Sequence, residues 1–108
     1  MSSKYQVLLF YSYSRIIDPI KFRDNHLRFC IENNIVGRII ISDEGINGTV
    51  SGKVKDCKKY INKIKSYKIF NGIEFKVDNI EKNVFKKINV RVKKEIVNSG
   101  ITNKKIIN

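Results

Sequence analysis

Residues 36–52 read VGRIIISDEGINGTVSG, and this stretch decides the fold of the chain. Two short runs of strand-forming residues flank a polar turn, and four glycines punctuate the stretch. Glycine supplies the positive φ angles that tight turns and bulges need. The pattern therefore predicts a β-hairpin, with strands near residues 38–42 and 47–51.

The residues before the hairpin predict a strand and a helix. Residues 5–13 are apolar on both faces, as in a central strand of a sheet. Asp18 and Pro19 suit the start of a helix, because Asp caps free amide groups and Pro is tolerated in the first turn. The helix should run to about Asn34, and Gly37 is placed to end the turn that follows it. Its expected apolar stripe consists of Ile20, Leu27, Cys30 and Ile31.

The residues after the hairpin predict a second helix and two further strands. Apolar residues recur at a helical spacing of three or four, at Val54, Cys57, Ile61 and Ile64. Apolar and polar residues then alternate over residues 73–78 and 88–93, as in half-buried strands, with a polar link between them.

The order strand, helix, strand, strand, helix, strand is the split βαβ arrangement. We therefore predict an α+β domain of the ferredoxin-like class (βαββαβ). Its antiparallel sheet should carry two helices on one face, plus an extra C-terminal strand. The domain should occupy residues 1–97, and residues 98–108 should form a polar tail.

The chain has 108 residues and a net charge of +12, most of it in the second half. Residues 1–50 hold 6 Lys and Arg against 5 Asp and Glu, whereas residues 51–108 hold 16 against 5. A basic half attracts polyanions such as nucleic acids. The surplus of lysine also fits a general bias of this sequence toward Lys, Ile and Asn. The positions of the cations are therefore better evidence for a binding site than their number.

Neither a membrane span nor a metal site is indicated. No apolar run approaches the roughly 20 residues of a membrane span, and the first residues lack an apolar signal region, so we expect a cytoplasmic protein without a membrane partner. Cys30 and Cys57 lie at apolar helical positions without metal-ligand spacing, so we expect two buried thiols, no metal and no cofactor. His26, the single histidine, is expected at a helix edge.

Five blocks of the sequence resemble the rhodanese-domain tRNA uridine hydroxylases, in the order in which that family has them. Residues 43–49 (DEGINGT) resemble the family's EEGINGT, and residues 36–39 (VGRI) its KGRI or KGRV. Residues 5–11 (YQVLLFY) look like its opening strand, and residues 26–30 (HLRFC) like its HLxFC segment. Residues 85–97 (FKKINVRVKKEIV) resemble its FKKLxVRxRKEIV stretch.

The resemblance implies the N-terminal domain of an oxygen-dependent enzyme that hydroxylates the wobble uridine of tRNA at C5. In the family a rhodanese domain follows in the same chain and carries the catalytic cysteine in a loop like CTGGIR, which is absent here. We therefore expect an excised domain or a truncated gene product with no catalytic residues of its own. The resemblance implies that this domain supports the rhodanese domain or contacts tRNA weakly.

The best basic cluster surrounds the last predicted strand. Alternation places Asn89, Arg91 and Lys93 on one face of that strand. A strip of cations suits the tracking of a phosphate backbone, although charge also protects an exposed strand edge. The candidate nucleic-acid contacts are Lys86, Lys87, Arg91, Lys93 and Lys94.

The hairpin motif is a second candidate site. Glycine-rich turns can offer backbone N–H groups to a phosphate. The same residues can also serve turn geometry alone, or contact the rhodanese domain. The candidate contacts are Glu44, Gly45, Asn47, Gly48 and Thr49.

A small acylphosphatase-type phosphohydrolase is the alternative function, because that activity occurs on the same architecture. Such enzymes bind phosphate through an arginine in a glycine-rich turn after the first strand. Residues 12–15 (SYSR) supply Arg15 here but no glycine.

Overall fold

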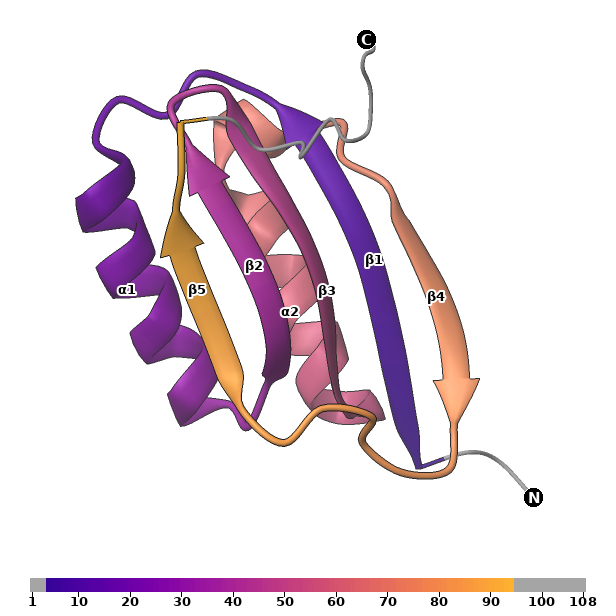
Figure 1. Cartoon of the computed structure of the whole chain (residues 1–108). Coiled ribbons are helices and arrows are strands. Elements are labelled where there is room, and N and C mark those ends of the chain that lie inside the picture. The colour runs from indigo at the N-terminus through magenta and orange to yellow at the C-terminus, as the bar shows by residue number, and fades with distance from the viewer. Residues whose placement is uncertain (1–3, 95–108) are drawn as a thin grey trace, which may run out of the picture.

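The computed structural model describes residues 4–94. A five-stranded sheet in the order β4-β1-β3-β2-β5 is covered on one face by two helices (Figure 1). The helices are α1 (Pro19–Glu32) and α2 (Val54–Ser66), with a short 3-10 helix η1 (Lys68–Phe70) after α2. The strands are β1 (Tyr5–Tyr13), β2 (Val36–Ser42), β3 (Gly45–Lys53), β4 (Phe75–Ile80) and β5 (Ile88–Val92). The predicted ferredoxin-like α+β architecture, with its extra strand, is confirmed.

The extra strand makes the sheet mixed instead of wholly antiparallel. Strands β1 to β4 pair antiparallel, whereas β5 pairs parallel with β2 at the edge far from β4. Residues 81–87 therefore cross from one edge of the sheet to the other, along the lower end in Figure 1. The Ser51 hydroxyl on β3 hydrogen-bonds Asn83 Oδ1 at 2.7 Å, and the Gly37 N–H on β2 donates to the Lys87 carbonyl at 2.8 Å. These two bonds hold the crossing segment against the sheet.

The predicted hairpin is confirmed, with longer strands and a tighter turn. Strands β2 and β3 pair from Val36 opposite Ser51 to Ser42 opposite Gly45, so the turn is Asp43-Glu44 alone. The Glu44 N–H donates to the Ser42 hydroxyl at 2.9 Å within this turn. Residues 45–49 therefore belong to a strand and not to a turn.

The expected role of Gly37 was wrong, because Gly37 lies inside β2. Asn34 takes the left-handed conformation after α1, with φ of 57°. Gly37 has φ of 135°, and a Cβ there would run into the Thr49 carbonyl oxygen on β3. A glycine is required at position 37 because β2 and β3 approach each other closely there.

Helix α1 begins as predicted, and half of its expected stripe faces the core: Cys30 is buried and Leu27 packs against the core. The Asp18 carboxylate caps it by accepting the Lys21 N–H at 3.1 Å. Ile20 and Ile31, expected in the core, are each 60% exposed. The buried positions are Cys30 and, against expectation, His26, because a hydrogen-bond partner inside the core accommodates this polar ring.

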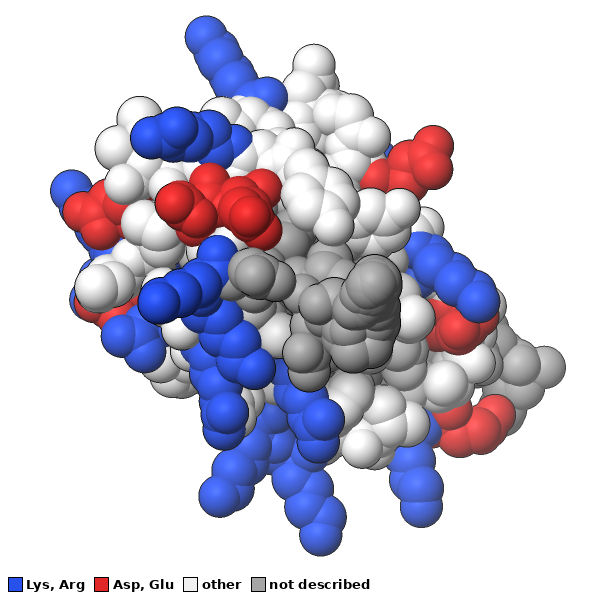
Figure 2. Space-filling model, turned by 45° about the horizontal axis from the view of Figure 1, so that its top comes forward, with Lys and Arg blue, Asp and Glu red and all other residues white. Residues whose placement is uncertain are grey.

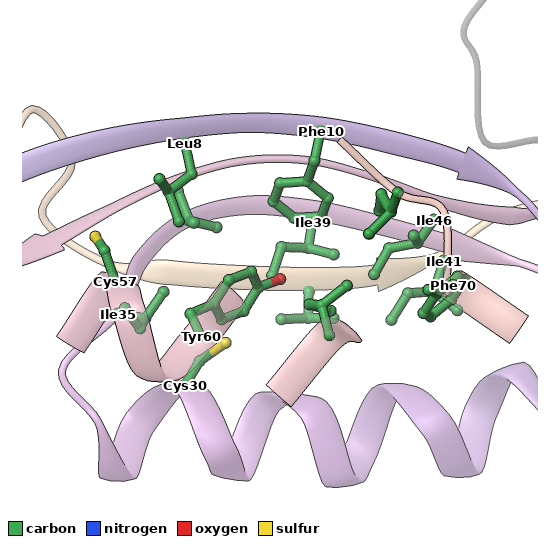
Figure 3. Close-up of a cluster of buried hydrophobic side chains, with 14 of the residues drawn as sticks. Leu8, Phe10, Cys30, Ile35, Ile39, Ile41, Ile46, Cys57, Tyr60 and Phe70 are labelled. Carbon is green, nitrogen blue, oxygen red and sulfur yellow. The ribbon is translucent and has the colours of Figure 1, made fainter. Parts of the chain in front are cut away.

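That partner is Tyr60 of α2, which lies at the middle of the core (Figure 3). Its ring contacts Phe10 of β1 with centroids 5.5 Å apart, and its hydroxyl lies 2.8 Å from His26 Nε2. Gly48 of β3 has no side chain, and the Phe10 ring takes the space that a Cβ at Gly48 would need. Burial raises the pKa of Tyr60 well above its ordinary value.

Stability should depend on pH through His26. Burial, with a contribution from the Lys63 charge, lowers its pKa from 6.5 to about 4. Between these values the unfolded chain binds a proton that the folded chain does not, so the free energy of unfolding falls as the pH is lowered. We expect a loss of roughly 2 kcal/mol from pH 7 to pH 5, measured by urea denaturation. His26→Gln should remove most of this dependence, and an unchanged pH dependence in that variant would contradict the assignment.

Gly45→Ala should destabilise the fold. Gly45 has φ of 146°, and a Cβ there would run into the Ser12 carbonyl oxygen. We expect the free energy of unfolding to fall by about 2–4 kcal/mol in urea denaturation. Gly72→Ala is the matched control, because nothing lies within 4 Å of a Cβ at Gly72. Equal effects of the two substitutions would show that the backbone at Gly45 is not constrained.

Candidate nucleic-acid interface

The face of the sheet opposite the helices is called the open face; it points toward the reader in Figure 1, where α2 lies behind the sheet. Strand alternation sends every second residue of each strand to it. On β1 these include Leu9, Tyr11 and Tyr13, which are 38%, 65% and 65% exposed. The same strand sends Leu8 and Phe10 to the core side, where both are buried. The open face thus presents a stripe of apolar and aromatic side chains along β1.

A groove with basic walls lies across β2 and β5 of the open face. Pairing sets Arg38 opposite Asn89 and Ile40 opposite Arg91. The groove encloses about 280 Å³. Its lining residues are Arg38, Ile39, Ile40, Asn89, Arg91 and Lys93, and we call it the basic groove.

The cations of the basic groove have no acidic partner among residues 4–94. Arg23–Asp24 is the single ion pair in this part of the chain, so no carboxylate described there lies within 4.0 Å of Arg38, Arg91 or Lys93. Figure 2 shows Lys and Arg side chains gathered on the side of the molecule where β5 lies. As far as residues 4–94 are concerned, these three cations can therefore accept an anion without first breaking an ion pair.

Local hydrogen bonds hold the walls of the basic groove in place. Arg91 Nε donates to the side-chain oxygen of Asn89, two residues before it on the same strand, at 3.2 Å. The Lys93 N–H donates to the Ile41 carbonyl at 2.9 Å and extends the pairing of β5 with β2 by one step. The backbone, and not a flexible loop, positions these cations.

The structure brings together part of the predicted basic cluster. Arg91 and Lys93 line the basic groove. Lys86 and Lys87 lie in the crossing segment before β5, and Lys94 follows β5; all three are exposed and none lines the groove. Arg38 also lines the basic groove, although the sequence analysis did not predict it. The sequence shows which face of its strand Arg38 occupies, but it does not show that β2 pairs with β5.

The hairpin candidates do not form a glycine-rich turn. Gly45, Asn47, Gly48 and Thr49 lie in β3, which pairs with β1 on one side and β2 on the other. Glu44 is exposed in the turn itself. A contact of this motif with phosphate or with another domain stays a prediction.

Neither cysteine is prepared for nucleophilic chemistry. Both thiols are buried, as predicted. Burial raises the pKa of Cys30 to about 12 and that of Cys57 to about 11, so both remain protonated near neutral pH.

Among residues 4–94 no three His, Cys, Asp or Glu side chains lie together as a metal site. Within the same residues, no helix has the length and apolar character needed to cross a membrane.

Solved structures of other proteins share the fold. The chain superposes on the dark-state BLUF protein BlrB with a TM-score of 0.68 over 97% of this chain and 76% of that one, at 15% identity. For the BlrP1 BLUF domain the TM-score is 0.69, over 87% of this chain and 67% of that one, at 11% identity. At such low identity the likeness concerns the architecture alone.

Curated relatives share the sequence itself. The chain is 46% identical over 101 residues to the tRNA uridine(34) hydroxylase of Acholeplasma laidlawii, covering 94% of this chain and 32% of that protein. It is 50% identical over 93 residues to the tRNA uridine(34) hydroxylase of Staphylococcus saprophyticus, covering 86% of this chain and 29% of that protein. The chain thus spans about a third of the length of these relatives.

The sequence model of the UPF0176 acylphosphatase-like domain matches residues 5–96, which include every helix and strand described above. The chain therefore belongs to the UPF0176 acylphosphatase-like domain family and is homologous to the N-terminal third of tRNA uridine(34) hydroxylases.

Proposed function

We propose that this chain is the tRNA-contacting domain of a tRNA uridine(34) hydroxylase. The basic groove binds the phosphate backbone of the tRNA. The observation that carries the proposal is the set of three cations, Arg38, Arg91 and Lys93, on adjacent strands without a carboxylate partner among residues 4–94. The name of the relatives supplies the substrate class.

The chemistry of the basic groove matches a phosphodiester chain. An arginine guanidinium presents a planar set of N–H donors that fits two phosphate oxygens at once. Arg38 and Arg91 lie on neighbouring strands, whose backbones are about 4.8 Å apart, so both can reach one short stretch of backbone. Each neutralised phosphate releases counterions, which favours binding at low salt.

In this proposal the domain holds the substrate and does not carry out the hydroxylation. Cys30 and Cys57 are buried as protonated thiols. The relatives are about three times as long as this chain. The oxidation step then belongs to the part of the enzyme outside this domain, in keeping with the rhodanese loop that the family resemblance implies.

The geometry does not favour the alternative phosphohydrolase. Arg15, the candidate phosphate ligand, lines an open hollow together with Asp43 and Glu44 of the hairpin turn. Two carboxylates beside one guanidinium repel a phosphate and compete for the arginine. We therefore do not propose phosphate hydrolysis at this end of the sheet.

Reversing the charge of the basic groove should weaken tRNA binding. The unmodified chain should bind tRNA with Kd of roughly 10⁻⁴–10⁻⁶ M at physiological salt, as in non-specific contacts. The double variant Arg91→Glu, Lys93→Glu should bind at least about tenfold more weakly. It should also lower the slope of log K against log salt by about 2, because two phosphate contacts are lost. Fluorescence anisotropy of labelled tRNA across a salt series measures both quantities.

The matched control is Lys58→Glu, Lys59→Glu on α2. Both lysines are exposed on the helix side of the sheet, and the control changes the net charge by the same four units. It should reduce binding much less than the groove variant does. Equal losses in the two variants would mean that the attraction is diffuse and that the basic groove is not a site.

A further inference from the structure

Tyr11 and Tyr13 are two aromatic side chains that the core does not use. Each is 65% exposed on the open face, although β1 is an inner strand of the sheet. Their rings lie edge to face with centroids 6.3 Å apart. Aromatic rings left in water on a rigid strand offer flat apolar faces to a ligand.

The tyrosines lie in register with the basic groove. One row across the open face runs from Tyr11 through Asn47 and Ile40 to Arg91. Three strand-to-strand steps separate its ends, which is about 14 Å between backbones. The next row runs from Tyr13 through Gly45 to Ser42, and Tyr13 also lines the open hollow that holds Arg15, Asp43 and Glu44.

We propose that Tyr11 and Tyr13 stack unpaired bases of an RNA strand whose phosphates lie in the basic groove. The open face then selects single-stranded over double-stranded RNA. The inference rests on the proposed function, because the basic groove must hold the backbone for the bases to reach the rings. It adds the class of RNA, namely unpaired nucleotides in a loop or at an end.

Two physical facts favour unpaired bases as the occupant. A duplex hides the faces of its bases by stacking, whereas a single strand can turn them outward onto aromatic side chains. The cations of the basic groove have no carboxylate partner among residues 4–94, so this side of the open face is complementary to a polyanion and less so to an ordinary protein surface. Aromatic rings and a cationic wall on one face are the combination that binds single strands with little sequence preference.

The test compares two RNA probes on the full 108-residue chain. One probe is labelled decauridylate, and the other is a labelled blunt-ended RNA duplex with about the same number of phosphates. Wild-type protein should prefer decauridylate. The double variant Tyr11→Leu, Tyr13→Leu should lose about tenfold in decauridylate affinity for each ring removed, with no change in duplex affinity. Tyr11→Phe, Tyr13→Phe keeps both rings and should bind like wild type.

Tyrosine emission gives a second readout, because the chain has five Tyr and no Trp. Stacking should quench part of this emission when decauridylate is added to the wild type, and the Leu variant should lose that quenching. Circular dichroism with thermal unfolding checks that each variant is folded. Ile31→Ala on α1, which removes an exposed apolar side chain away from the open face, should leave both affinities unchanged.

The outcomes separate this inference from the proposed function. If the Leu variant binds decauridylate like wild type while Arg91→Glu, Lys93→Glu weakens both probes, stacking is overturned and the proposed function stands. If the Phe and Leu variants lose affinity equally, the rings are not the binding element and stacking is again overturned. If the charge reversal leaves both probes unaffected, the proposed function fails and the placement of the RNA fails with it. If wild type binds neither probe at low salt, both proposals are wrong. A protein partner would then be the next candidate for binding to the open face.

Discussion

The parallel pairing of β5 with β2 is the contact on which the basic groove depends. It sets Arg38 beside Asn89 and Ile40 beside Arg91. A shift of one residue would turn Arg91 toward the core and Val90 toward water, because successive side chains point to opposite faces. Val90 is only 5% exposed, so burial of this apolar side chain fixes the register and keeps the cations on the open face.

The layer of helices makes the open face available by burying the other one. Tyr60, His26 and Phe10 join α1, α2 and β1 through ring contacts and one hydrogen bond. A sheet with one covered face can leave the other for binding, provided that the covered face supplies enough apolar burial for stability. Tyr11, Tyr13 and the cations of the basic groove thus stand on a scaffold that does not need these side chains for its core.

The sequence predicts the strands and α2 well, because period-2 and helical spacings are local signals. It predicts the burial of α1 only in part, since the polarity of His26 argues for an edge and only the tertiary structure supplies the Tyr60 hydroxyl. It also misses Arg38 as a lining residue of the basic groove. That residue joins Arg91 through a parallel pairing between strands more than 45 residues apart, which no local pattern encodes. Arg91 and Lys93 were found because strand alternation alone puts them on one face.

The packing of Phe10 over Gly48 means that two positions distant in sequence share a single volume. The ring fills the space that a side chain on β3 would take, so neither position can be enlarged independently. A bulkier residue at position 48 fits only if position 10 becomes smaller. In a set of homologous sequences this constraint would be visible as co-variation between the two sites, with their combined side-chain volume held nearly constant while each residue type changes.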